Sequence, residues 1–108
     1  MIARLMGLKT ISPKELLAAV QQQSVHVFDL NAQHVFKAGH VPGAVHLNHE
    51  TFEGSELPDD KKADLVFYCS NPMCRKAPNA AKLAKTKGYQ NVRVLSAGIN
   101  GWISKKLP

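Results

Sequence analysis

The sequence is poor in cysteine and contains no long apolar run. Two cysteines in 108 residues are too few for a disulfide framework and are typical of a protein from a reducing compartment. The N-terminal segment 1–8 is apolar but short, and Arg4 interrupts it, so we expect neither a signal peptide nor a membrane span. These absences predict a soluble cytoplasmic protein with no membrane partner.

Acidic residues are also scarce, since 8 Asp and Glu stand against 14 Lys and Arg, for a formal net charge of +6. The basic residues are spread along the chain and do not form a run interleaved with aromatic residues, as nucleic-acid-binding segments often do. We therefore expect no nucleic-acid partner. The positive charge is better suited to attracting small anions toward a basic site.

Strand-like and helix-like patterns alternate along the chain, starting with a short strand at 10–11. Apolar segments predict further strands at 25–29, 45–47, 65–68 and 92–95, and helical spacing predicts helices at 13–23, 32–37, 77–87 and 99–105. Segment 48–62 is a polar connector. The alternation indicates an α/β fold, a single domain over 1–108 whose parallel sheet has helices on both faces.

Local signals mark several boundaries of these elements. Ser12-Pro13-Lys14-Glu15 combines a capping-box pair with proline at the first helical position. Asn31 is the expected cap of the short helix that ends before Gly39. Pro42-Gly43 predicts a tight turn, because proline presets the first turn angle and glycine accepts a positive φ at the next position.

The candidate site lies where the apolar strand 65–68 ends in Cys69 and a loop leads into the next helix. Asp29 ends the neighbouring strand pattern in the same way, and ligands of open parallel sheets bind at these carboxyl ends. The loop and the first helical turn present unpaired N–H groups that favour negative charge. A helix N-terminus and nearby cations lower a cysteine pKa from about 8.5 to about 3.5–7.5, so we expect Cys69 to be a thiolate nucleophile. The competing interpretation is a buried structural cysteine.

The sequence resembles a rhodanese domain over about residues 10–108. The resemblance rests on Asp29, the block Gly39-His40-Val41-Pro42-Gly43-Ala44, the strand–Cys69–loop–helix unit, Gly88-Tyr89, and Ala97-Gly98-Ile99 followed by Trp102. It implies a five-stranded, mostly parallel sheet and a sulfurtransferase in which Cys69 carries a persulfide sulfur. Asn31 and Val35 depart from the family pattern, which usually has arginine and an acidic residue at these positions, so a supporting ion pair is missing.

The loop after Cys69 looks longer than the usual sulfurtransferase loop, and Pro72 lacks an N–H group that could face an anion. Its expected substrate-binding residues are Ser70, Asn71, Met73, Cys74, Arg75 and Lys76. The Cys-x5-Arg spacing matches the phosphatases and arsenate reductases of this fold, with Arg75 as a planar donor to a tetrahedral oxyanion. Loss of an alkoxide needs a general acid, and the loop has no carboxylate. Glu50, Glu53 and Glu56 in the connector are the candidates that stay open for this role.

The favoured function is transfer of a sulfane sulfur from thiosulfate or a persulfide donor to a thiophilic acceptor, a thiol or a protein. We expect neither a cofactor nor a metal, because the cysteine spacing is not that of a zinc site. His40 is expected to be structural. Cys74 either attacks a persulfide or forms a disulfide with Cys69, or it merely packs at the helix start. A non-enzymatic persulfide carrier or binding module remains the alternative to an enzyme.

Overall fold

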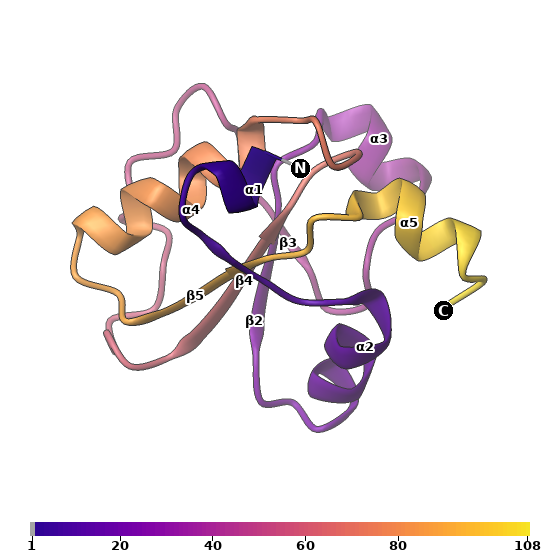
Figure 1. The fold of residues 1–108 in the computed structure, drawn as a ribbon, viewed down its shortest axis with the longest axis horizontal. Helices are drawn as coiled ribbons and strands as arrows, with labels where there is room; N and C mark the ends of the chain where they lie inside the picture. Colours follow the sequence, from indigo (N-terminus) through magenta and orange to yellow (C-terminus); the bar gives the residue numbers. More distant parts are fainter. Residues whose placement is uncertain (1) are drawn as a thin grey trace.

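The computed structural model describes residues 2–108, which form a five-stranded sheet in the order β1-β5-β4-β2-β3 (Figure 1). The strands are β1 (Lys9–Thr10), β2 (His26–Asp29), β3 (Val45–His46), β4 (Asp64–Tyr68) and β5 (Asn91–Val94). All neighbouring strands pair in parallel, so the predicted α/β fold is confirmed and its sheet is parallel throughout. Because β4 is the central strand, its carboxyl end lies in the middle of the row formed by the carboxyl ends of all five strands.

Helices cover both faces of the sheet. They are α1 (Ile2–Leu5), α2 (Pro13–Gln21), α3 (Gln33–Ala38), α4 (Lys76–Thr86) and α5 (Gly98–Ser104). One buried cluster joins α1, α4 and the connector to the sheet, and a second joins α2, α3 and α5 to its other face (Figure 1). None of the helices within residues 2–108 is long and apolar enough to cross a membrane.

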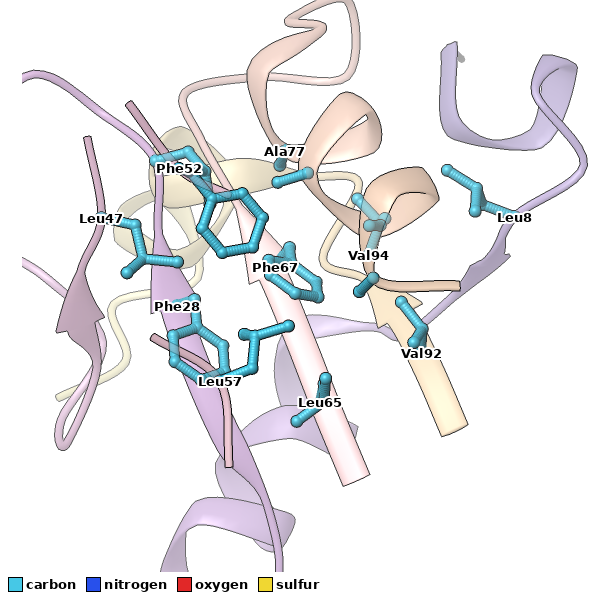
Figure 2. Close-up of a cluster of buried hydrophobic side chains, with 14 of the residues drawn as sticks. Leu8, Phe28, Leu47, Phe52, Leu57, Leu65, Phe67, Ala77, Val92 and Val94 are labelled. Atoms are coloured by element: carbon cyan, nitrogen blue, oxygen red, sulfur yellow. The ribbon is translucent and has the colours of Figure 1, made fainter. Parts of the chain in front are cut away.

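Strand β4 is buried on both faces because its side chains alternate between the two clusters. Leu65 and Phe67 belong to the cluster drawn in Figure 2, whereas Val66 and Tyr68 point into the other cluster. Phe67 stacks on Phe28 of β2 with ring centroids 5.4 Å apart. The strand that carries the candidate nucleophile is therefore held rigidly from both sides.

The predicted capping box at α2 is present. Ser12 Oγ accepts a hydrogen bond from the Glu15 N–H at 3.2 Å, and the Glu15 carboxylate accepts one from the Ser12 N–H at 2.9 Å. These hydrogen bonds hold the pKa of Glu15 below its usual value. Gly43 in the predicted turn has φ +81°, as a positive-φ position requires.

Two predictions about local structure are wrong. Helix α1 precedes the short strand that we expected to be the first ordered element. It is only four residues long and has almost no periodicity, but the buried Ala3 and a hydrogen bond from the Ile2 N–H to the Pro72 carbonyl oxygen (3.1 Å) attach it to the loop after β4. Asn31 does not cap α3, whose N-cap is Ala32, because the Asn31 side chain has a different partner.

Candidate active site

Cys69 follows β4 directly, and 3% of its surface is exposed. Its Sγ accepts a hydrogen bond from the backbone N–H of Ala77 at 3.5 Å. Ala77 is the second residue of α4, so one of the free N–H groups of the first helical turn points at the sulfur. This donor and the positive end of the helix dipole lie where they can stabilise a thiolate at Cys69 once its disulfide is reduced.

Helix α5 fixes the beginning of the loop. The N–H of Ile99 donates to the Cys69 carbonyl oxygen at 2.9 Å, and the N–H of Asn100 donates to the Ser70 carbonyl oxygen at 3.0 Å. Gly98 makes this approach possible, because its φ is +66° and a Cβ at this position would overlap the Ser70 carbonyl and lie 2.7 Å from Asn71 N. The Ala97-Gly98-Ile99 segment is therefore part of the loop's support.

The loop folds back on itself in a turn from Asn71 to Cys74. The Cys74 N–H donates to the Asn71 carbonyl oxygen at 3.1 Å, and the Met73 N–H donates to Asn71 Oδ1 at 2.9 Å. Asparagine at the first turn position and proline at the second are typical of such a turn. The turn brings Cys74 over Cys69, and the two residues form a disulfide with Cα atoms 6.5 Å apart.

Side chains from the neighbouring strand end hold the other side of the loop. Buried Asp29 accepts a hydrogen bond from the Asn31 N–H at 2.8 Å, and Asn31 Oδ1 accepts one from Ser70 Oγ at 2.7 Å. Asn31 therefore links the β2 end to the loop by a neutral hydrogen bond. This contact joins the loop to β2 without the charged side chain expected at position 31.

Tyr68 lies immediately before Cys69 and is fully buried. Its hydroxyl oxygen accepts a hydrogen bond from the Val41 N–H at 3.0 Å, which ties the turn at 41–43 to the sheet. Burial, together with the neighbouring Asp29 carboxylate, raises the pKa of Tyr68 far above its usual value. The phenol therefore stays neutral. Its hydrogen bond with Val41 helps to fix the end of β4, from which Cys69 follows.

A pocket of about 420 Å³ opens beside the disulfide. It is lined by His49, Phe52, Cys74, Arg75, Lys76, Asn79, Ala80 and Leu83. A second pocket of about 330 Å³ shares His49 and Lys76 with the first and extends toward Asn31. The first pocket thus combines apolar side chains, two cations and one cysteine of the disulfide.

The family model of the rhodanese-like domain matches residues 12–105. The chain belongs to this family. The resemblance that its motifs predicted is thereby confirmed.

Individual relatives agree with the assignment to the rhodanese-like family. Thiosulfate sulfurtransferase GlpE of Haemophilus influenzae is 28% identical over 103 residues, which cover 95% of each chain. The HTH-type transcriptional regulator Rv0324 of Mycobacterium tuberculosis is 31% identical over 100 residues, but the match spans only 43% of that protein's length. The human single-domain sulfurtransferase TSTD1 has the same fold, with a TM-score of 0.75 and 23% identity over 89% of this chain and 96% of the human one.

Of the predicted substrate-binding residues, some line the pocket and the others do not. Cys74, Arg75 and Lys76 line it. Ser70 instead donates a hydrogen bond to Asn31, and Asn71 accepts one from the Met73 N–H. Met73 lies outside the pocket lining with 64% of its surface exposed. His40 stacks on Phe36 with ring centroids 3.8 Å apart, in agreement with the structural role predicted for it.

Sequence reasoning missed five residues that line the rhodanese-like pocket, namely His49, Phe52, Asn79, Ala80 and Leu83. Asn79 lies one turn after Arg75 on α4, and its N–H donates to the Arg75 carbonyl oxygen, so helical spacing could have identified it. His49 and Phe52 come from the connector 48–62 and carry no sequence signal for the site. None of the residues that line this pocket has a carboxylate, whereas Glu50 lines the second pocket.

Proposed function

We propose that the chain is a sulfurtransferase that carries a sulfane sulfur as a persulfide on Cys69. The observation that carries this proposal is the hydrogen bond from the Ala77 N–H to Cys69 Sγ at the end of β4. It supplies the donor that a thiolate needs at a position fixed by the sheet and by α5. The relatives named thiosulfate sulfurtransferase GlpE support the same reaction class.

The reaction begins from the reduced pair of cysteines. The Cys69 thiolate attacks the outer sulfur of a donor such as thiosulfate, a new S–S bond forms on Cys69, and the S–S bond of the donor breaks. Sulfite leaves with the electron pair of that bond. A thiophilic acceptor then takes the outer sulfur and returns Cys69 to the thiolate.

Arg75 and Lys76 are the groups best placed to bind the anionic part of the donor. Both line the pocket next to Cys74, and Arg75 is exposed at the N-cap of α4. A guanidinium presents several donors in one plane to a sulfonate or carboxylate oxygen. The net charge of +6 attracts such anions over a longer range.

The Cys-x5-Arg spacing also fits a phosphatase or an arsenate reductase, but the pocket favours sulfur transfer. A phosphatase must protonate its leaving alkoxide, and the described pocket that contains Cys74 and Arg75 has no carboxylate for this step and His49 as its one histidine. Sulfite and thiolates leave without such an acid. A non-enzymatic carrier would share the first chemical step and would differ only in turnover.

The test is to reduce the protein, remove the reductant and measure sulfite released from thiosulfate and thiocyanate formed when cyanide is added. With cyanide in large excess, so that it takes the sulfur before Cys74 does, we expect the wild type to form both products and Cys69→Ser to form neither. The near-ultraviolet circular dichroism of buried Trp102 checks that the variant is folded. Sulfite release that persists in folded Cys69→Ser excludes the nucleophile. Hydrolysis of p-nitrophenyl phosphate that needs Cys69 and exceeds sulfur transfer establishes the phosphatase instead.

A further inference from the structure

We infer that Cys74 is a second catalytic residue, which attacks the persulfide on Cys69. This attack forms the Cys69–Cys74 disulfide and releases hydrosulfide. A thiol reductant then reduces the disulfide and returns both cysteines to thiols. The inference rests on the proposed function, because it names the fate of the sulfur that Cys69 takes up. It identifies the product as sulfide and the consumed partner as a thiol.

The loop is built to bring the second sulfur to the first. The turn closed by the Cys74 N–H and the Asn71 carbonyl oxygen reverses the chain between the two cysteines. The resulting Cα–Cα separation of 6.5 Å allows a disulfide without movement of the sheet or of α4. Anchoring of the Cys69 and Ser70 carbonyls by α5 keeps one end of this loop fixed while Cys74 approaches.

Burial favours an internal attacker over an external one. With Cys74 bonded to it, Cys69 has 3% of its surface exposed and lies between the loop and α4, so a large acceptor has less access to its sulfur than Cys74 has. Cys74 reaches the same sulfur from within the loop. An intramolecular thiol acts at a high effective concentration, which gives it the advantage over a dilute external thiol.

The electron balance of the resolving step is complete. Cys74 Sγ, as a thiolate after losing its proton to solvent, attacks Cys69 Sγ and forms the disulfide bond seen in the structure. The bond between Cys69 Sγ and the outer sulfur breaks, and its electron pair leaves with that sulfur as hydrosulfide. The outer sulfur is reduced and the two cysteines are oxidised, so each turnover consumes two electrons that the thiol reductant must return.

The two sulfurs of the disulfide are not equivalent, and this asymmetry directs the reductant. Cys74 is partly exposed and lines the 420 Å³ pocket with Arg75 and Lys76, whereas Cys69 is buried. A thiol therefore attacks Cys74. Cys69 is then the leaving group, and the Ala77 N–H stabilises it as a thiolate, which speeds its departure. The reset returns Cys69 directly to its nucleophilic form.

The decisive experiment is a single turnover without oxygen. Reduced wild type and Cys74→Ser, both free of reductant, are mixed with thiosulfate, and we measure sulfite, sulfide and the mass of tryptic peptide 63–75, which contains both cysteines. We expect both proteins to release sulfite. We expect sulfide only from the wild type, whose peptide loses two hydrogens, while the Cys74→Ser peptide gains one sulfur atom and keeps it. Wild type without thiosulfate must stay reduced.

The outcomes separate the inference from the proposed function. If the wild-type protein releases no sulfide and its peptide keeps an added sulfur, the resolving role is overturned and sulfur transfer stands. Absence of sulfite from both proteins overturns the proposed function itself. Addition of glutathione or of reduced thioredoxin to the spent wild type then identifies the reductant as a small thiol or a protein dithiol. Failure of both to restore sulfite release overturns the assignment of a thiol reductant.

Discussion

Gly98 is the residue whose substitution tests how the site is held. Its φ of +66° lies in the region that disfavours a side chain, and a Cβ would overlap the Ser70 carbonyl and crowd Asn71 N. Both contacts involve backbone atoms, which cannot rotate away as a side chain would. Gly98→Ala must therefore push α5 away from the loop that carries Cys69.

The expected magnitude has two parts. A residue with a Cβ in the left-handed region costs about 1–2 kcal/mol. Separation of α5 from the loop also weakens the hydrogen bonds that Ile99 and Asn100 donate, each worth about 0.5–1.5 kcal/mol. We expect Gly98→Ala to lower the free energy of unfolding by about 2–4 kcal/mol and to reduce sulfite release by displacing the Cys69 carbonyl.

Two other glycines separate these contributions. Gly43 has φ +81° with open space around its Cβ position, so Gly43→Ala measures the backbone cost alone. Gly39 has an extended φ of 167° and nothing near its Cβ position, so Gly39→Ala should be close to neutral. Urea unfolding monitored by Trp102 fluorescence gives the free energies, and the single-turnover assay gives sulfite. Gly98→Ala with the stability of Gly43→Ala and full sulfite release would refute the close-approach argument.

Two further predictions concern Arg75 and Tyr68. Hydrogen bonds that Arg75 is expected to donate to the anionic part of a bound donor are worth about 1.5–3 kcal/mol, so Arg75→Ala, which changes a residue of the pocket lining, should slow sulfite release by roughly one to two decades. Loss of this cation from the loop should also raise the pH midpoint of Cys69 alkylation. Exposed Lys82→Ala makes the same change of charge on α4 and should have little effect, and equal losses would indicate only long-range attraction. Tyr68→Phe removes the acceptor of the Val41 N–H and should destabilise the fold by about 1–3 kcal/mol in urea. The pKa of Tyr68 is raised in the folded protein, so its contribution to stability is complete below the pKa of about 10 that tyrosine has in the unfolded chain. This contribution decreases as the pH rises above that value. Tyr68→Phe should therefore make the stability less dependent on pH in the alkaline range.

Elements that depend on local pattern could be predicted from the residues alone. The apolar run 65–68 placed Cys69 at a strand end, because a segment that is apolar at every position is stable only when both of its faces are buried. Ser12 and Glu15 predicted the start of α2 through contacts only three residues apart. The Cys-x4-Cys spacing left a disulfide and simple packing of Cys74 both open, and the local turn at Asn71-Pro72 brings the two cysteines together.

The groups that meet around Cys69 from distant parts of the chain come together through folding and have no local signal. His49 and Phe52 reach the pocket from a connector without periodicity, and Asn31 contacts Ser70 across 39 positions of sequence. Helix α1 is too short to form from its own hydrogen bonds, since a single turn pays the full cost of nucleation. Helix α1 is stabilised by its buried residues and by its hydrogen bond to the loop after β4. These contacts depend on tertiary packing and could not be predicted from a short apolar segment.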